Sequence, residues 1–309
     1  MSSNKRLSAI ILLIVAMIIW GSAFAVTKAA LEEVPPVLFA LLRYVTASIL
    51  LIVFVILSGK LAKIPRPVPW VAIVLMGSSG VFLYTIAYNV SLVYTSASQG
   101  AMVQSFIPAV TTLFAAAFLR ESLSRIRLIG IGISILGIFL IMFFAEADVD
   151  APNSFLGNVM MLLSVILWAG YTLFAKRLAK FDPLVITAGA TIVGTALLIP
   201  AALFELGNKG FPTISATGWT GVIYLGLFSS AVAMLLYNRS LQYLSAGETA
   251  NFLNLMPVVA VLVAVVFLGE SPTFKQITGG VLVLFGVWVS LQNRSGTPIE
   301  EITETPPVS

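Results

Sequence analysis

The amino-acid sequence predicts an all-α integral membrane protein with ten transmembrane helices, arranged as two inverted five-helix repeats. Three observations lead to this prediction: long uncharged apolar segments, basic residues gathered in alternate loops, and a five-segment pattern that occurs twice. Of the 309 residues, 59% are hydrophobic and only 10% are charged, whereas soluble proteins carry about 25% charged residues. A chain this apolar is expected to lie in a lipid bilayer.

Ten apolar segments are separated by charges or polar stretches. An apolar segment of about 20 residues is expected to cross the bilayer as a helix, because lipid offers the backbone no hydrogen-bond partners. In the first half the segments are 7–27, 34–59, 67–119 (two spans divided at the polar stretch 89–99) and 128–145. In the second half they are 151–175, 183–204, 210–238, 249–269 and 276–293.

The first segment has an alternative interpretation as a secretory signal peptide. Lys5 and Arg6 precede its apolar run, and Ala23-Phe24-Ala25 resembles a cleavage site. The internal repeat argues against this alternative, because the counterpart of this segment lies in the middle of the chain and cannot be a signal.

The distribution of basic residues predicts the orientation. With the N-terminus in the cytoplasm, thirteen of the 17 Lys and Arg residues fall on the cytoplasmic side, three on the other side, and Arg43 inside a span. Positive charge is retained on the cytoplasmic side of membranes. We therefore expect a multi-pass plasma-membrane protein with both termini cytoplasmic. The net charge of +4 lies in short loops and does not indicate nucleic-acid binding.

Residues 88–122 and 237–271 align at an offset of 149 residues. A Tyr-Asn pair begins each stretch, a Glu-Ser pair ends it, and Pro108 matches Pro257. Because each repeat holds five spans, an odd number, the second copy enters the membrane from the opposite side. Inverted repeats are typical of secondary transporters, since the halves can exchange two packings around a site at the midplane.

These patterns define the predicted organisation of the chain. The first repeat is expected at 7–145 and the second at 151–292. Residues 295–309 are polar, Pro-rich and acidic, and we expect a disordered tail.

The repeats resemble EamA domains of the drug/metabolite transporter superfamily over about residues 7–292. The resemblance rests on WGSAFAVTK at 20–28, on Pro35-Pro36 followed by Leu42-Arg43-Tyr44, and on the duplicated Tyr-Asn, Ser-Ala, Pro and Glu-Ser pattern. It implies a ten-helix exporter or importer of amino acids or other small metabolites, with a central cavity lined mainly by spans one, three, four, six, eight and nine. The second half departs from the first at Thr191, near the place of an Arg43 equivalent, so any role of Arg43 is not duplicated.

Polar and aromatic side chains within the spans are the candidates for substrate contact, because polar groups in lipid usually face the bundle interior. The candidates are Trp20, Arg43, Tyr84, Tyr88, Gln104, Trp168, Tyr171, Tyr237, Asn251 and Asn254. The alternative for Arg43 is snorkelling to the external interface beside Glu32 or Glu33. The alternative for the tryptophans is packing or lipid contact. An amide binds a zwitterion, an amide or a heterocycle, so these residues do not define the substrate.

Three further residues are candidates for the transport cycle. Pro108 and Pro257 are expected to kink spans four and nine and to act as hinges, with a static bend as the alternative. Glu248 aligns with Gln99, so the acid is present in one half only. It is a candidate for proton coupling or for contact with a cationic substrate, and the alternative is a partner for a helix N-terminus.

Composition also excludes several functional classes. The chain has no Cys and no His, which removes thiol chemistry and His-ligated metals, and we find no P-loop. We therefore expect no enzyme activity, no cofactor and no metal. The leading hypothesis is a monomeric secondary transporter of small metabolites, amino acids or similar compounds, exported rather than imported, by alternating access. The alternatives are a vitamin or nucleoside-type importer of the same family, a channel, and an intramembrane enzyme. Few polar residues lie in the spans, and they differ between the halves, which argues against a channel.

Overall fold

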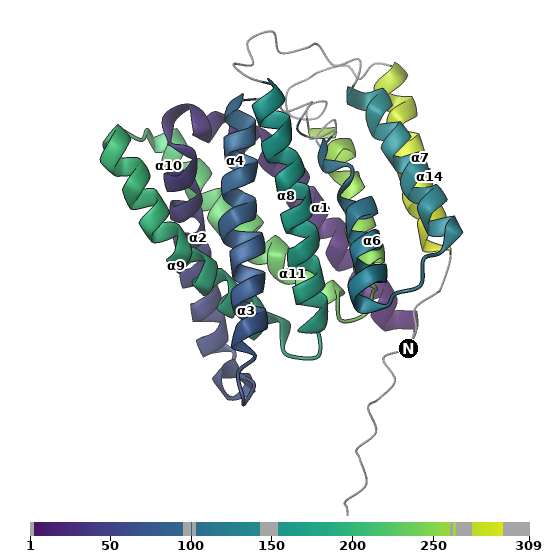
Figure 1. Cartoon of the computed structure of the whole chain (residues 1–309), viewed down its shortest axis with the longest axis horizontal. Coiled ribbons are helices and arrows are strands. Elements are labelled where there is room, and N and C mark those ends of the chain that lie inside the picture. Colours follow the sequence, from purple (N-terminus) through teal and green to yellow (C-terminus); the bar gives the residue numbers. More distant parts are fainter. Residues whose placement is uncertain are drawn as a thin grey trace, which may run out of the picture.

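The computed structural model describes residues 3–94, 100, 103–142, 154–259, 262–263 and 274–292. Over these ranges the chain is a bundle of roughly parallel helices without a strand (Figure 1). Six helical segments are long and apolar enough to cross a membrane: Asn4–Ala23, Pro36–Leu57, Trp70–Tyr94, Phe155–Arg177, Pro183–Asn208 and Ala216–Ser240. The all-helical membrane prediction is therefore confirmed, and the count of ten spans stays a prediction.

The helices follow one another in this order: α1 (Ser3–Glu33), α2 (Pro36–Leu57), η1 (Lys60–Lys63), α3 (Trp70–Gly77), η2 (Ser78–Leu83), α4 (Tyr84–Tyr94), α6 (Ile107–Leu119), α7 (Arg125–Met142), α8 (Ser154–Arg177), α9 (Pro183–Lys209), α10 (Ala216–Tyr224), η3 (Leu225–Ala233), α11 (Met234–Ser240), α12 (Ala246–Asn251), η4 (Phe252–Leu255) and α14 (Phe274–Leu291). The predicted boundary between the repeats and the predicted tail, 295–309, lie outside the described residues.

Several helices run past the ends of the apolar segments that predict them. α1 continues to Glu33 instead of ending near Thr27, and α4 includes the first part of the polar stretch 89–99 and ends at Tyr94. Residues 95–99, the rest of the stretch expected to divide the two spans, lie outside the described residues. The amide of Asn89 is fully buried and donates to the carbonyl oxygen of Pro36 at 2.9 Å. A polar residue therefore does not end a span when a neighbouring helix offers it a partner.

Two π-helical stretches, η2 and η3, interrupt two of the long apolar segments at corresponding places. A glycine lies at the start of each, and the two glycines, Gly77 and Gly226, are 149 residues apart. A Cβ placed on Gly77 would collide with the carbonyl oxygen of Ala190 in α9, and one on Gly226 would lie 2.9 Å from the carbonyl oxygen of Arg43 in α2. Small residues thus allow α3 to approach α9, and η3 to approach α2.

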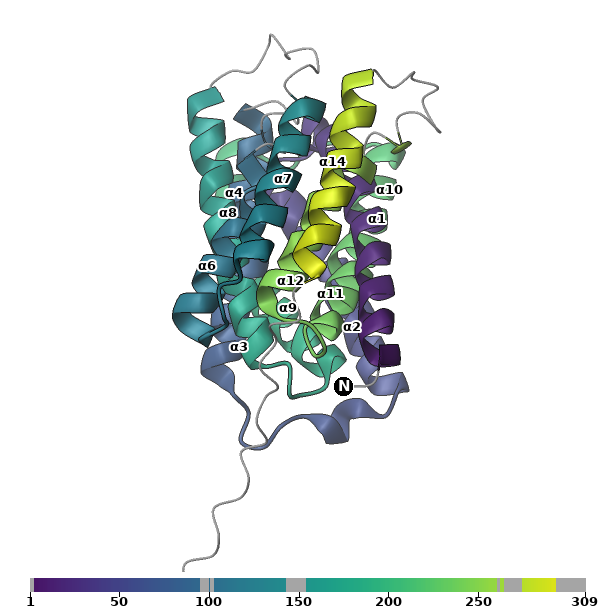
Figure 2. The same ribbon diagram turned by 90° about the vertical axis from the view of Figure 1, so that its right-hand side faces the viewer.

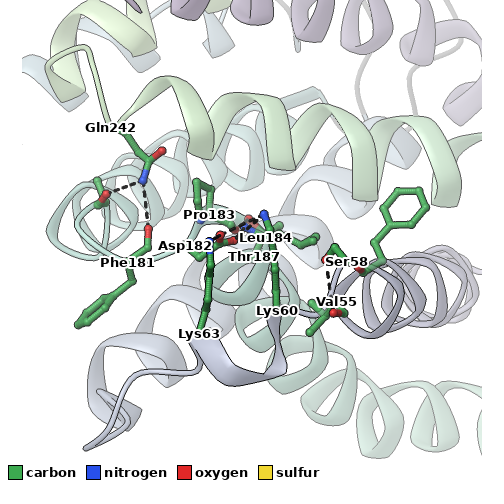
Figure 3. A network of polar contacts seen from close by, with 12 residues as sticks. Val55, Ser58, Lys60, Lys63, Phe181, Asp182, Pro183, Leu184, Thr187 and Gln242 are labelled. Carbon is green, nitrogen blue, oxygen red and sulfur yellow. Dashed lines mark hydrogen bonds and ion pairs between the residues drawn. The ribbon is translucent and has the colours of Figure 1, made fainter.

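Helices α2 and α9 are joined at both ends by carboxylates. Asp182 caps the N-terminus of α9 and forms an ion pair with Lys60 at 3.0 Å, as Figure 3 shows. At the other end, Glu205 of α9 accepts hydrogen bonds from the backbone N–H groups of Val37 and Leu38 at 3.0 and 2.9 Å. Both carboxylates meet the positive end of a helix dipole, which stabilises them.

Helices α7 and α14 lie side by side and pack mainly against each other (Figure 2). A Cβ placed on Gly130 would lie 2.6 Å from the carbonyl oxygen of Gly286, and one on Gly137 would lie 2.6 Å from that of Gly279. Gly279 is the counterpart of Gly130 in the repeat, and Gly286 is the counterpart of Gly137, each 149 residues further along the chain. Gly130 thus contacts the counterpart of Gly137, and Gly137 contacts the counterpart of Gly130. Such reciprocal contacts are typical of a two-fold axis.

We predict that Gly137→Ala weakens the α7–α14 contact and lowers the free energy of unfolding by about 1–3 kcal/mol, because the new methyl group overlaps the backbone of α14. Gly132→Ala is the matched control, since nothing lies within 4 Å of a Cβ at that position of the same helix. Thermal unfolding of the purified variants in one detergent checks the difference. Equal stability of the two variants would contradict the contact.

Candidate substrate cavity

A cavity lies inside the bundle, between α1, α2, α4, α6, α8, η3, α11 and η4. Its volume is about 60 Å³, which exceeds the roughly 10–15 Å³ that a cavity needs to hold one water molecule. The lining residues are Trp20, Ala23, Thr27, Arg43, Tyr44, Tyr84, Thr85, Tyr88, Gln104, Ile107, Trp168, Ser229, Met234, Leu253 and Met256. They come from both halves of the chain.

The cavity is not centred between the two ends of the bundle. Thr27 lies in the last third of α1, Arg43 in the first half of α2, and both line the cavity. These segments point toward the end of the bundle where α1 stops and α2 begins. The opposite end carries the start of α1 and the basic turn η1 (Figure 2). The cavity therefore extends from the middle of the helices away from the basic end.

Four aromatic rings form one wall of the cavity. The ring of Trp168 lies 5.3 Å from that of Trp20 in an edge-to-face arrangement and 4.8 Å from that of Tyr84. Tyr84 in turn stacks on Tyr88 at 5.8 Å. All four line the cavity, as do Arg43 and Gln104. The structure thus brings six of the ten predicted contact residues to one place.

Tyr171 and Tyr237 lie behind this wall. Both are fully buried, and their rings are 5.0 and 5.6 Å from that of Trp168. The hydroxyl of Tyr171 accepts a hydrogen bond from Asn238 at 2.6 Å, and that of Tyr237 is 2.9 Å from the hydroxyl of Thr172. The two tyrosines hold the Trp168 ring in place and do not line the cavity themselves.

Arg43 points into the bundle and not toward the interface. It is 7% exposed, and its Nη2 donates to the hydroxyl of Ser230 at 3.0 Å. Its guanidinium carbon lies 5.5 Å from the ring centre of Phe39 and 5.8 Å from that of Tyr44, within the range of cation–π attraction. The carboxylate of Glu33 bonds to the start of α10 instead. The snorkelling alternative for Arg43 therefore does not describe this structure.

The three amide candidates do not share one site. Gln104 lines the cavity and donates to the hydroxyl of Tyr84 at 3.3 Å. Asn254 lines a smaller hollow of about 20 Å³, next to Gln104. Asn251 is fully buried and donates to the hydroxyl of Ser290, which ties α12 to α14.

Pro108 and Pro257 both lie next to breaks in helical structure. Pro108 is in the first turn of α6, and a turn at residues 105–106 separates it from the helical residues 103–104. Pro257 follows the 3₁₀ stretch η4. Each proline therefore lies beside an interruption of regular helical hydrogen bonding, because proline has no N–H to donate. The hinge role of both prolines stays a prediction.

Sequence reasoning missed the hydroxyl side chains around the cavity. Ser229 lines the cavity within η3, and Ser230 beside it is the nearest partner of Arg43. Thr27 and Thr85 also line it. Hydroxyls in apolar segments carry little signal, because they can bond to their own helix and need no partner elsewhere.

Glu248 lies at the basic end, away from the cavity. It completes a capping box with Ser245 at the start of α12, and its Oε1 accepts from Nη2 of Arg6 at 3.1 Å. The side chain of Arg6 is 26% exposed and that of Glu248 is 8% exposed. The ion pair therefore joins the first turn of α1 to α12 in a partly buried setting.

Other charged residues meet at the same helix start. Glu121 accepts from the backbone N–H of Ala246 at 2.9 Å, and its other oxygen lies 3.9 Å from Nη1 of Arg127. Arg127, expected in a cytoplasmic loop, is only 1% exposed. Lys176 of α8 donates to the carbonyl oxygen of Leu244 at 2.7 Å. These contacts join α1, α7, α8, α12 and the segment that follows α6, and we call them the basic-end network.

Comparison with known proteins identifies close relatives in sequence and fold. The pattern of the EamA-like transporter family matches residues 7–143 and again residues 155–292. The chain is 29% identical to the "Uncharacterized transporter YetK" of Bacillus subtilis, over 93% of this chain and 88% of that one. It is 27% identical to the "Probable terminal-alkyne amino-acid exporter" of Streptantibioticus cattleyicolor, over 97% and 98%. A solved crystal structure at 19% identity has the same fold, with a TM-score of 0.77 over 92% of this chain and 96% of that chain.

We predict that Arg6→Gln loosens the basic-end network. A partly exposed ion pair contributes about 1 kcal/mol or less, so its loss raises the population of opened molecules up to about fivefold. The chain has no Cys, so Thr249→Cys introduces a single thiol at a fully buried position of α12. Its rate of reaction with a small methanethiosulfonate reagent measures the opening. Lys5→Gln, a loss of charge at the neighbouring exposed residue, is the control. Equal rates of thiol reaction in the Arg6→Gln and Lys5→Gln variants would show that the ion pair does not keep this end of the bundle closed.

Proposed function

The chain belongs to the EamA-like transporter family, and from this we propose that it is a secondary transporter of small metabolites, amino acids or compounds like them, by alternating access. One observation carries the proposal: a cavity walled by aromatic and polar side chains lies between the two halves of the chain, and the basic-end network joins the helices at the end away from it. A transporter needs a site near the midplane that faces one side of the membrane at a time.

We also propose ten spans in two inverted repeats. The two matches to one family support this, as does the reciprocal contact of α7 with α14. The π-helical stretches η2 and η3 support it further, because each lies where a glycine lets the helix approach α9 or α2. A pseudo-two-fold axis would relate these pairs, so that one half can adopt the packing of the other.

The proposed orientation places both termini in the cytoplasm. Arg6 at the start of α1, Lys60 in η1 after α2, Arg127 at the start of α7 and Lys176 at the end of α8 meet their partners at a single end of the bundle. Retention of positive charge on the cytoplasmic side favours that end as the inner one. On this orientation the described state is closed inside, and its cavity extends toward the outer face.

Export of amino acids or similar compounds is the favoured direction and substrate class. The relative named as a probable terminal-alkyne amino-acid exporter aligns over nearly the full length of both chains, which supports this choice. A second candidate is import of a vitamin or nucleoside-type solute, which the four aromatic rings favour because a planar heterocycle stacks on such faces. Both halves of the chain contribute residues to the cavity lining, and we propose a monomer as the functional unit.

We predict that purified protein in liposomes exchanges a labelled metabolite against the same metabolite inside with saturable kinetics. Saturation follows from a single site that must close on one side before it opens on the other. Uptake across amino acids, nucleosides and vitamins, measured against protein-free liposomes, identifies the class. Flux that rises linearly with concentration would favour a channel.

A separate prediction concerns Glu248. If this carboxylate couples protons to transport, Glu248→Gln abolishes exchange driven by a pH gradient and leaves exchange at equal pH intact. Glutamine also serves at the third position of a capping box, so the variant removes the charge and keeps the cap. Glu32→Gln, an exposed carboxylate of α1, is the control. Unchanged pH-driven exchange would leave Glu248 with only its structural contacts.

A further inference from the structure

Within the part of the chain that the structure describes, the cavity holds a positive charge with no counter-ion. Among the residues that the structure describes, its lining contains one cation, Arg43, and no carboxylate. The described ion pairs of the bundle involve Arg6, Lys60, Lys63 and Arg127, all at the basic end. A buried cation without a counter-ion is costly in any protein, and more so within a bilayer.

The hydrogen bonds of Arg43 are neutral and incomplete. Its Nη2 donates to Ser230 at 3.0 Å and more weakly to Ser229 at 3.5 Å, while its buried Nε has no partner. A guanidinium carries five N–H donors in a plane, and their spacing matches the two oxygens of a carboxylate. Two serine hydroxyls hold the group in place but leave its charge uncompensated.

The surroundings of Arg43 define what else a ligand meets. Trp20 donates its indole N–H to the carbonyl oxygen of Ser229 at 3.0 Å, which fixes this ring on the same η3 stretch that holds Arg43. The ring of Trp168 packs against that of Trp20, and the ring of Tyr84 packs against that of Trp168, which completes the aromatic wall beside Arg43. The lining that the structure describes offers no carboxylate to an ammonium group. A ligand that is only cationic is repelled by Arg43, and the faces of the aromatic rings are its only attractive partners there.

We propose that the cavity selects small monocarboxylates, with the carboxylate bound by Arg43 and the remainder against Trp20 and Trp168. This inference rests on the proposed transport function and narrows its substrate class. Amino acids fit because they carry a carboxylate, and their amino group is not required. Amides, esters and purely cationic solutes are excluded.

The test compares ligands that differ only in the carboxylate: propionate against propionamide, and L-alanine against L-alaninamide. Binding to the purified full chain is followed by tryptophan fluorescence, since Trp20 and Trp168 line the cavity. We expect propionate and alanine to bind, and each amide to bind roughly 30-fold more weakly or worse, as for loss of one partner of a buried charge pair. Equal binding of acid and amide, or equal binding of chloride or sulfate, would overturn the proposal.

Variants of Arg43 separate ligand binding from a structural role. Arg43→Gln is expected to lose the preference for the acids, Arg43→Lys to keep it at reduced affinity, and the exposed Arg239→Gln to leave it unchanged. Because Arg43→Gln removes an uncompensated charge, its Tm without ligand should equal or exceed that of the wild type. A lower Tm together with an unchanged preference for the acids would assign Arg43 a structural role and refute the inference.

Binding and transport fail separately. If the acids bind with this preference but no labelled acid exchanges in liposomes, the transport proposal fails and the carboxylate site stands. If amides or cations exchange at rates that Arg43→Gln does not change, transport stands and the carboxylate site is refuted.

Discussion

The constraint on which this structure depends is that polar groups inside a bilayer must find their partners within the protein. In this chain many of those partners come from the other half. Arg43 of α2 bonds to Ser230 of η3, and Glu205 of α9 bonds to the first turn of α2. Hydrogen bonding thus joins the two halves where lipid supplies no hydrophobic force to do so. Within the cavity this pairing is incomplete at two groups, the Nε of Arg43 and the indole nitrogen of Trp168.

The π-helical stretch η3 connects packing to the cavity. Gly226 lets this stretch approach α2 closely. The same stretch supplies the hydroxyl groups that bind Arg43 and the carbonyl group that orients Trp20. π-Helical turns interrupt the regular ladder of backbone hydrogen bonds and are frequent at functional sites. Its counterpart η2 meets α9, which carries Thr191 near the corresponding place. The chemistry of the cavity is therefore asymmetric although the packing beneath it is duplicated.

The sequence was sufficient to predict the membrane class, the family and the in-span residues that include Trp20 and Arg43. It was not sufficient to distinguish the aromatic residues that line the cavity from those that pack behind them, because the sequence of an apolar helix does not show which face an aromatic residue occupies. Tyr171 lies behind the wall and Asn251 bonds to α14. Both are polar side chains within apolar spans, which is the criterion that selected the cavity candidates. Ser229 illustrates the converse: its importance comes from a π-helical turn, which no period in the sequence predicts.

The contact between α7 and α14 has a consequence for how such a chain can arise. Each glycine of one helix meets the counterpart of the other, so the surface that α7 presents is complementary to its own duplicate in the opposite orientation. A half-length ancestor that inserted into the membrane in both directions would meet a second copy of itself across the same glycines. Gene fusion would then fix one copy in each direction, and residues such as Arg43 would be free to diverge because neither half would have to serve in both places.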